Sequence, residues 1–276
     1  MRSVKLLLAA GAVSLLSSAA FAADMAVAPA PYYAPPPQQD FGGWYLRGDI
    51  GMTNSSTKLH SNLYDTLPAG TSFQQFGQGF TGGMLWGLGV GYEFNSWFRV
   101  DITGEYRSRV AFSGSDYLIF PNGGGALSDV YSGGYKSWVG LVNAYADLGT
   151  WWCLTPFVGV GVGAAHVQTT GLQDSGITSF GAQSSYFASG ASTTNFAWAA
   201  HAGVAYKVTN NFTVELAYRY LVMGKAVHGQ GYFFDGTATG MSTFQFRDLT
   251  SQDLKIGVRW TCCDVAPPPP PIIRKG

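Results

Sequence analysis

The chain has 276 residues, which is enough for one large domain. Only 12% of its residues are charged against 15% aromatic, and it holds 37 glycines, a composition that favours a closed β-barrel with aromatic girdles over a soluble enzyme. The formal net charge is zero, so the composition offers no polybasic argument for binding nucleic acid.

A predicted signal peptide occupies residues 1–22. Arg2 and Lys5 precede the apolar run Leu6–Leu16, and Ala20-Phe21-Ala22 forms an A-x-A cleavage site. The apolar run is too short to cross a membrane as a helix, so we expect export and removal after Ala22, with a short uncleaved anchor as the alternative. No later run of about 18 apolar residues occurs, so no transmembrane helix is expected.

Proline-rich segments flank the central part of the chain. Residues 23–41 form an expected periplasmic linker, and residues 261–276 form a tail with two adjacent cysteines and the run Pro267–Pro271. Such runs favour an extended, polyproline-like chain. Between them lies the expected barrel, residues 42–260. An even number of strands returns the chain to the side it entered, so both termini are expected in the periplasm.

The stretch Phe98–Arg107 alternates without interruption between two kinds of side chain. Apolar or aromatic residues and one glycine occupy the even positions, and polar or charged residues occupy the odd positions. A period of two predicts a β-strand. Because stretches of this kind recur along the chain, we interpret one face as lipid-facing and the other as lining a polar lumen.

Eight such strands are expected, joined alternately by short links and by segments of roughly 25 residues rich in Gly, Ser, Thr and Asn. Their expected ranges are Gly43–Thr53, Gly82–Phe94, Phe98–Arg107, Ser137–Leu148, Thr155–Val167, Asn195–Val208, Phe212–Val222 and Leu249–Trp260. The prediction is all-β: an eight-stranded antiparallel up-and-down transmembrane β-barrel with short periplasmic turns and long extracellular loops. A soluble lipocalin-like barrel is the rival fold, and it needs an apolar interior and a polar exterior, the reverse of this pattern.

Several segments resemble the small outer-membrane β-barrel proteins of α-proteobacterial type, a porin-family or outer-membrane β-barrel-domain group. The resemblance covers residues 41–260 and rests on the signal ending Ala20–Asp24, the proline-rich lead, the first strand Gly43–Gly51 and the last strand ending at Trp260. It implies the fold and a location in the outer membrane of a Gram-negative bacterium. For activity it implies less, because the family contains structural proteins, adhesins, surface antigens and proposed pores.

The last expected strand also implies a partner. In the resembled family the closing strand ends on an aromatic residue that the barrel-assembly machinery recognises. Here that pattern is carried by Leu254, Ile256, Val258 and Trp260. The chain departs from the family because residues 261–276 follow Trp260, so either recognition tolerates an internal signal or the tail has a periplasmic role of its own.

Strand parity places equal numbers of cations and anions in the lumen. An eight-stranded barrel is just wide enough for its side chains to fill it, and an unpaired buried charge costs several kcal/mol. We therefore expect a charge-paired, largely closed lumen, with a narrow ion path as the alternative. The expected luminal network, which includes one histidine, comprises Arg47, Asp49, Glu93, Arg99, Asp101, Glu105, Arg107, Asp147, His201, Lys207, Glu215, Arg219, Asp253, Lys255 and Arg259.

Signals for an enzyme are weak. His201 is the one histidine expected to face the lumen, and the next residue on its face is Gly203 rather than a nucleophile. The glycines of Gly159–Gly163 lack the G-x-G-x-x-G spacing of a nucleotide site, and we expect them to make room for large luminal side chains instead. We expect no catalytic residues and no cofactor.

Three cysteines are expected on the oxidising periplasmic side, Cys153 in a short turn and Cys262 and Cys263 after the last strand. One disulfide from Cys153 to the vicinal pair would tie the tail across the barrel mouth, and unpaired thiols are the alternative. The spacing of cysteines and histidines is poor for zinc, so no metal is expected.

Aromatic residues are scattered through the expected long loops, which suits either ligand recognition or outer girdles. Three functional classes follow. The first is a non-enzymatic barrel that stabilises the envelope and presents a surface, the second is a small porin, and the third is an adhesin or ligand receptor acting through its loops. Expected partners are outer-membrane lipid and lipopolysaccharide, the assembly machinery and an extracellular ligand, but no nucleic acid.

Overall fold

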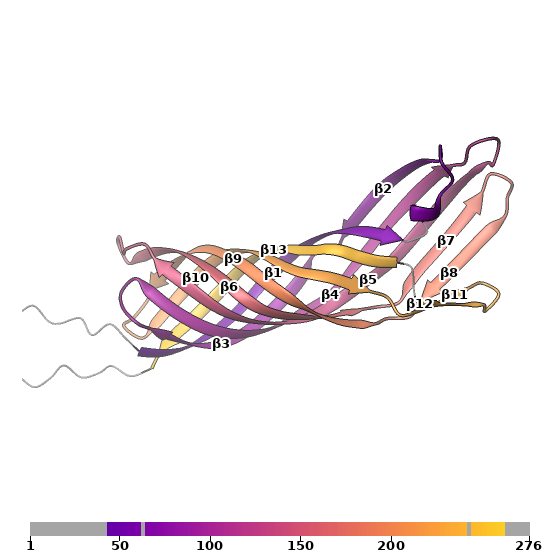
Figure 1. The fold of residues 1–276 in the computed structure, drawn as a ribbon. Helices are drawn as coiled ribbons and strands as arrows, with labels where there is room; N and C mark the ends of the chain where they lie inside the picture. The colour runs from indigo at the N-terminus through magenta and orange to yellow at the C-terminus, as the bar shows by residue number, and fades with distance from the viewer. Residues whose placement is uncertain (1–42, 62–63, 242–243, 263–276) are drawn as a thin grey trace, which may run out of the picture. The chain divides into compact units, whose positions relative to one another are not determined.

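The computed structural model describes residues 43–61, 64–241 and 244–262 (Figure 1). The chain divides into two compact units, and every described residue belongs to the unit Asp40–Ala266. Within the described ranges the one helical element is the 3-10 turn η1, Tyr64–Thr66, and no helix is long and apolar enough to cross a membrane. The predicted signal peptide, the linker and most of the C-terminal tail lie outside the described residues.

Eight antiparallel strands form a closed ring, which confirms the predicted barrel. Their order around the ring is β1, β3, β4, β5, β6, β9, β10 and β13, and β13 pairs with β1 to close it. Their bounds are β1 Gly43–Ser61, β3 Gly83–Glu93, β4 Phe98–Ile119, β5 Ala126–Asp147, β6 Leu154–Thr169, β9 Ser192–Lys207, β10 Phe212–Val227 and β13 Phe244–Thr261. Tyr45 pairs with Thr261, so the ring begins and ends at one end of the barrel.

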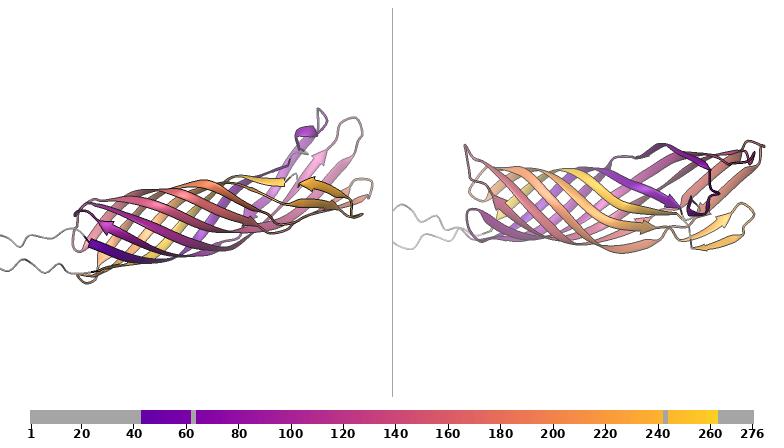
Figure 2. Two further views of the ribbon diagram at one scale, coloured as in Figure 1. Left: turned by 60° about the horizontal axis from the view of Figure 1, so that its bottom comes forward. Right: turned by 45° about the horizontal axis from the view of Figure 1, so that its top comes forward.

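Five further strands lie in segments predicted as long loops. They are β2 Ser72–Phe80, β7 Leu172–Thr178, β8 Gln183–Ala188, β11 Gln230–Phe233 and β12 Ala238–Met241. They join the projecting ends of β4 and β5 in an open sheet with the order β2-β4-β5-β7-β8-β11-β12, which we call the outer sheet (Figure 2). The predicted long connections are present, but parts of them are β-strands, because β4 and β5 extend past the ring and offer backbone groups for these Gly- and Ser-rich segments to pair with.

The opposite end of the barrel carries short turns, as predicted. In the turn between β3 and β4, Asn95 Oδ1 accepts hydrogen bonds from the backbone N–H groups of Trp97 and Phe98, at 3.0 and 2.8 Å. In the turn between β9 and β10, Thr209 Oγ1 accepts one from Phe212 at 3.1 Å. Such side-chain bonds hold tight turns. Short turns at one end and long connections at the other are typical of outer-membrane barrels, whose turns face the periplasm.

Aromatic residues lie in two belts on the outside of the ring. Near the turns, Trp44 packs edge-on against Tyr92 with ring centroids 5.4 Å apart. Further along the strands, the ring centroid of Tyr106 lies 6.2 Å from that of Trp86 and 4.8 Å from that of Trp138, and we call these three residues the outer belt. Between the belts the outward side chains are apolar and exposed, for example Leu88 at 75%. This is the lipid-facing surface of a membrane barrel, and the outer sheet lies beyond it.

Candidate functional site: the barrel lumen

Inward-facing glycines create the space that the large luminal side chains fill. A Cβ atom at Gly91 would collide with the ring of Tyr45, and one at Gly159 would collide with the ring of Tyr145. A Cβ atom at Gly161 would collide with the amide of Asn143. Glycine therefore stands opposite a large neighbour on adjacent strands, which agrees with the expectation for the Gly159–Gly163 run.

Arg47 is the centre of a cluster on the turn side of the lumen. Its Nη1 lies 2.7 Å from Asp101 Oδ2, and its Nη2 lies 2.9 Å from Asp49 Oδ1 and 3.4 Å from Glu215 Oε2. Nη1 also donates a hydrogen bond to the hydroxyl of Tyr145 at 3.1 Å. One guanidinium thus contacts acceptors from four strands, and its fork geometry suits such multiple pairing.

Glu215 gathers two further arginines on the same side. Arg99 Nη2 lies 3.4 Å from Glu215 Oε1, and Arg259 Nη1 lies 3.1 Å from the same oxygen. The Arg99 guanidinium also stacks over the rings of Tyr145 and Phe157, 4.2 and 4.8 Å from their centroids. Cation–π contacts of this kind compensate part of the desolvation of a buried arginine.

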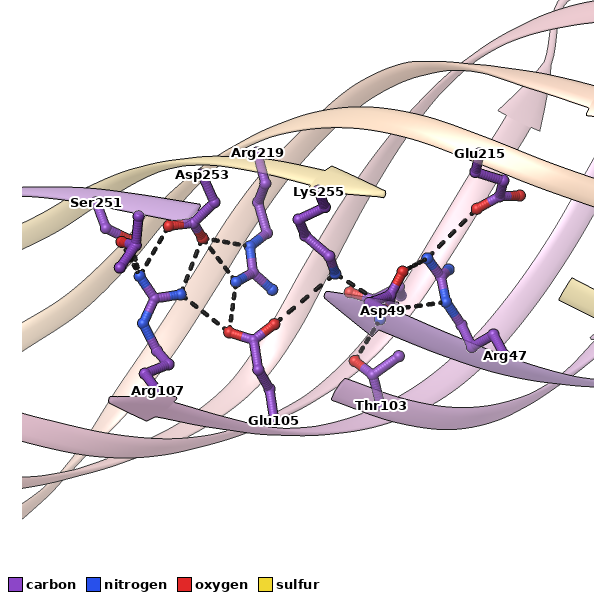
Figure 3. A network of polar contacts seen from close by, with 12 residues as sticks. Arg47, Asp49, Thr103, Glu105, Arg107, Glu215, Arg219, Ser251, Asp253 and Lys255 are labelled. Atoms are coloured by element: carbon purple, nitrogen blue, oxygen red, sulfur yellow. Dashed lines mark hydrogen bonds and ion pairs between the residues drawn. The ribbon is translucent and has the colours of Figure 1, made fainter. Parts of the chain in front are cut away.

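A second cluster lies nearer the outer sheet and holds two arginines and two carboxylates (Figure 3). Arg107 binds Asp253 with both terminal nitrogens, at 2.9 and 2.8 Å, and donates to Glu105 Oε1 at 2.9 Å. Arg219 binds the same two carboxylates, with Nη2 2.6 Å from Glu105 Oε1 and Nε 2.8 Å from Asp253 Oδ2. Paired bidentate contacts of this type are among the strongest charge-assisted bonds in proteins.

Lys255 joins the two clusters. Its Nζ lies 3.3 Å from Asp49 Oδ2 in the first cluster and 3.7 Å from Glu105 Oε2 in the second. The lumen therefore contains one continuous network of opposite charges that runs along the barrel axis, as Figure 3 shows. Because each cation has anionic neighbours, the desolvation cost of burying these charges is offset by pairing.

The structure brings most of the expected luminal residues into this network. Glu93 and Asp147 are half-buried at the turn end, where Glu93 pairs with Arg259 and Asp147 with Arg99, both at 3.3 Å. Lys207 is a correction, because it is exposed at the end of β9 and takes part in no ion pair within the described part of the chain. The alternation of inward and outward side chains continues to the last residue of a strand, but the lumen ends before that residue. The alternation therefore predicted an inward, buried position for Lys207, which is wrong.

His201 faces the lumen beside the charge network but forms no ion pair with a described residue. It pairs in register with Arg219 on β10 and Gly159 on β6, and its ring packs 5.4 Å from that of Tyr145. The side chain is buried, and its Nε2 has no hydrogen-bond partner among the described residues. The described residues also contain no group of three or more His, Cys, Asp or Glu side chains that could hold a metal.

An apolar plug on the outer side of the charge network was not predicted. Its buried side chains include Tyr135, Val139, Leu221, Met223 and Phe246, and it continues into the outer sheet. The signal was present in the sequence, because Leu221 lies at the same strand parity as Glu215 and Arg219 in the expected strand. The polar pattern of the turn-side half was extended over the whole lumen, although the inward positions become apolar towards the outer end.

The remaining expected residues lie outside the lumen. No disulfide joins Cys153 to Cys262, and Cys263 lies outside the described residues, so a bridge from Cys153 to Cys263 stays a prediction. The side chains of Leu254, Ile256, Val258 and Trp260 are exposed on the lipid-facing side of β13, which is the strand that closes the ring. Their recognition by the assembly machinery also stays a prediction.

Comparisons with known proteins agree with this fold. A family model for the outer membrane protein beta-barrel domain matches residues 8–261. The chain is 34% identical over 232 residues to an uncharacterized protein of Brucella suis biovar 1 (strain 1330), covering 79% of this chain and 80% of the relative. It is 27% identical over 221 residues to a protein named as a candidate adhesin from Rickettsia bellii (strain RML369-C), covering 79% and 87%.

One solved structure is reported for comparison. The crystal structure of the outer membrane protein OprG from Pseudomonas aeruginosa matches with a TM-score of 0.44 and 13% identity, over 81% of this chain and 97% of that chain. The closed eight-stranded ring, the aromatic belts and the family match agree with one another. The chain belongs to the outer membrane protein beta-barrel domain family and is a Gram-negative outer-membrane protein.

Proposed function

We propose that this protein is a non-enzymatic barrel that stabilises the outer membrane and carries the outer sheet at the cell surface, with a lumen that is closed to ions and solutes. The observation that carries the proposal is that side chains fill both halves of the lumen. Paired charges fill its turn-side half, and the apolar plug fills its outer half.

The proposal of a closed lumen rests on the way its charges are held. Arg99, Arg107 and Arg219 are almost completely buried, and each lies against two carboxylates. A permeating ion would have to separate such pairs, and breaking a buried pair costs roughly 3–5 kcal/mol. It would then have to pass side chains such as Tyr135 and Phe246, which offer it no replacement for its hydration shell.

Planar-bilayer recording of the refolded full chain tests the closed lumen against the small-porin alternative. We expect a quiet baseline after insertion, with insertion verified by the heat-modifiable mobility of the same preparation on gels. Steady conductance in the range of open porins would contradict the proposal and favour the porin.

The non-enzymatic part of the proposal rests on the surroundings of His201. The groups beside it in register are Arg219 and Gly159, and neither is a nucleophile or an acid that could orient the ring. We expect no turnover of fluorogenic peptides or phospholipids by the refolded protein. Turnover that disappears in a His201→Ala variant would overturn this part of the proposal.

A second candidate function, recognition of an extracellular ligand, is favoured by the outer sheet. Exposed aromatic residues on its strands and in the turns that join them include Phe76, Phe180, Phe187 and Phe234, with Phe180 77% and Phe234 84% exposed. Large exposed aromatics are unusual in contact with water and are common in recognition surfaces. The candidate-adhesin name of the Rickettsia bellii relative points in the same direction.

Adherence of bacteria that display the protein tests this second function. Phe180→Ser combined with Phe234→Ser should abolish the adherence to mammalian cell monolayers that the unmodified protein confers. The matched control is Trp152→Ser, which removes an aromatic side chain that is 95% exposed in a turn at the opposite end of the barrel. Equal adherence of all three strains would count against recognition through the outer sheet.

A further inference from the structure

Four exposed cations that the lumen does not use lie just beyond the outer belt. They are Arg109 on β4, Lys136 on β5, Lys225 on β10 and Arg247 on β13. Arg109 follows the belt residue Tyr106, and Lys136 precedes the belt residue Trp138. These cations therefore lie where the outer leaflet of the membrane meets its polar headgroups.

A β-bulge turns Arg109 out of the lumen. The odd residues Arg99–Arg107 of β4 face inward, so an uninterrupted strand would place Arg109 in the lumen as well. Between Arg107 and Val110 the register with β5 shifts, and beyond the shift Val110 is buried and Arg109 is exposed. Bulges at barrel rims re-aim side chains in this way.

The same change occurs on two other strands at this level. On β10 the register shifts at Gly224, which has a φ of 79°, and Lys225 is exposed although the odd residues before it face inward. On β13 the register shifts at Asp248, which has a φ of 54°, and Arg247 is exposed while Phe246 is buried. Three separate bulges thus place a cation outside and an apolar residue inside.

The four cations form two patches on opposite walls of the ring. Arg109 lies opposite Lys136 at the bulge between β4 and β5, and Lys225 lies opposite the Arg247-Asp248 bulge between β10 and β13. In the ring order, β6 and β9 separate the patches on one side and β1 and β3 on the other. Among the described residues none of the four cations takes part in an ion pair, although Asp248 adjoins Arg247.

Two grooves adjoin the Arg109–Lys136 patch. The upper groove, of about 580 Å³, is lined by Arg109, by the apolar residues Phe80, Ala111 and Phe112, and by the hydroxyl and amide side chains of Thr81, Ser113, Ser132 and Gln173. The lower groove, of about 600 Å³, lies on the lipid-facing surface beneath it and is lined by apolar residues that include Leu88, Tyr106, Trp138 and Ile256. Its floor includes Gly104, where a Cβ atom would meet nothing within 4 Å.

We propose that the two patches bind the phosphate groups of lipid A, the lipid anchor of lipopolysaccharide in the outer leaflet. At the Arg109–Lys136 patch the upper groove takes the phosphorylated sugar and the lower groove takes an acyl chain. The kind of ligand is inferred from the order in which charged, polar and apolar surfaces follow one another along the barrel axis. Cations and hydrogen-bond donors lie above an apolar trough at the depth of the membrane, and an anionic headgroup attached to acyl chains matches both.

Binding of purified lipid A to the refolded full chain in detergent tests this proposal. Native mass spectrometry measures stoichiometry and affinity for lipid A with both phosphates, for dephosphorylated lipid A and for inorganic phosphate. We expect tight binding of the phosphorylated lipid, and an affinity at least about tenfold lower for the dephosphorylated lipid, because removing the phosphates removes their charge-assisted bonds to the cations. Equal binding of both lipids, or displacement of the lipid by millimolar inorganic phosphate, would overturn it.

Matched variants locate the sites. Arg109→Gln with Lys136→Gln should remove one bound lipid A, and Lys225→Gln with Arg247→Gln should remove the other. Lys207→Gln, which removes an exposed cation at the turn end, should bind lipid A as the unmodified protein does. Patch variants that fold, as judged by heat-modifiable mobility, and retain full binding would overturn the proposal.

Two measurements keep the test independent of the folding of those variants. Gly104→Leu fills the lower groove without altering any charge and should weaken binding of lipid A, and unchanged affinity would overturn the assignment of that groove. A salt titration of the unmodified protein should lower the affinity steadily, because exposed charges are screened within about 10 Å at 0.1 M salt. Affinity that does not change with salt would overturn the role of the cations.

Discussion

Lys255 Nζ lies 3.3 Å from Asp49 Oδ2, across the seam where the last strand of the ring meets the first. Both side chains are buried, and the same ammonium also reaches Glu105 on β4 at 3.7 Å. The contact links two ion-pair clusters and also two strands that are at opposite ends of the sequence. The same side chain therefore bridges the closing seam of the ring and neutralises carboxylates of the lumen.

Lys255→Met should destabilise the barrel by about 3 kcal/mol, because Met matches the length of Lys but leaves Asp49 and Glu105 with one cation fewer in a buried site. Urea unfolding in phospholipid vesicles, followed by tryptophan fluorescence, measures the free energy of unfolding. The control is Lys207→Met, which removes an exposed and unpaired lysine and should change the stability by less than about 0.5 kcal/mol.

A double variant separates the charge pair from the packing of the lysine stem. Asp49→Asn with Lys255→Met removes both partners, so its cost should be smaller than the sum of the two single costs. Additive costs would mean that the two charges do not interact.

Arg107→Ala combined with Arg219→Ala should not produce a steady channel, although it empties much of one charge cluster. The apolar plug, which includes Tyr135 and Phe246, would still fill the outer half of the lumen. Conductance should require the further changes Tyr135→Ala and Phe246→Ala, and planar-bilayer recording distinguishes the two variants. Open-porin conductance in the first variant alone would show that the charges are the whole barrier.

The ring and its charges could be predicted from the sequence because a strand in a membrane barrel has a different solvent on each face. On β4 the alternation of Arg99, Asp101 and Glu105 with apolar residues predicts a membrane-spanning β-strand and also shows which of its faces points into the lumen. The pairing of β1 with β13 follows from ring closure, because the first and last strands of an up-and-down barrel are neighbours. Those features depend on local pattern and on one global constraint.

The bulges and the outer sheet could not be predicted in this way. The bulge at Arg109 reverses the parity of β4, and nothing in the neighbouring residues marks the position where the reversal occurs. Strand β8, Gln183–Ala188, contains Ser and Gln, which give it a weak intrinsic preference for β-structure. It forms a strand because β7 and β11 pair with it. Lys207 shows a related limit. The alternation of side chains predicts which way a residue points, but it does not predict where along the barrel axis the enclosed lumen ends.

Gly91→Val should prevent folding or lower the free energy of unfolding by more than about 2 kcal/mol, because its side chain would overlap the ring of Tyr45 in a filled lumen. Gly104→Val provides the comparison, since Gly104 faces outward and a Cβ atom there meets nothing within 4 Å. Valine favours strands, so this second variant should be neutral or slightly more stable. Urea unfolding measures both variants, and equal costs would argue against the fit between the inward glycines and their large neighbours.

The outer sheet contains three aspartates that face one another beyond the membrane. Asp129 on β5 pairs in register with Asp116 on β4, and Asp174 lies on the neighbouring strand β7. Burial, with the charge of Asp116, raises the pKa of Asp129 to about 6. Burial, with the charges of Asp129 and Asp116, raises the pKa of Asp174 to about 7. The hydroxyl of Tyr131 donates a hydrogen bond to Asp116 at 3.1 Å.

The stability of the outer sheet should therefore fall as pH rises. An aspartate in an unfolded segment has a pKa of about 4. A carboxyl group whose pKa is higher in the folded state contributes stability that is fully present below this unfolded pKa. The contribution is lost as pH rises through the folded pKa values of about 6 and about 7.

Hydrogen exchange of the β5 and β7 amides, corrected for the intrinsic effect of pH, should show protection that declines between roughly pH 4 and 7. Asp129→Asn with Asp174→Asn should remove the decline, whereas Asp235→Asn, in the exposed turn between β11 and β12, should leave it in place. Protection that is constant with pH in the unmodified protein would mean that the three carboxyl groups do not repel one another in the folded sheet.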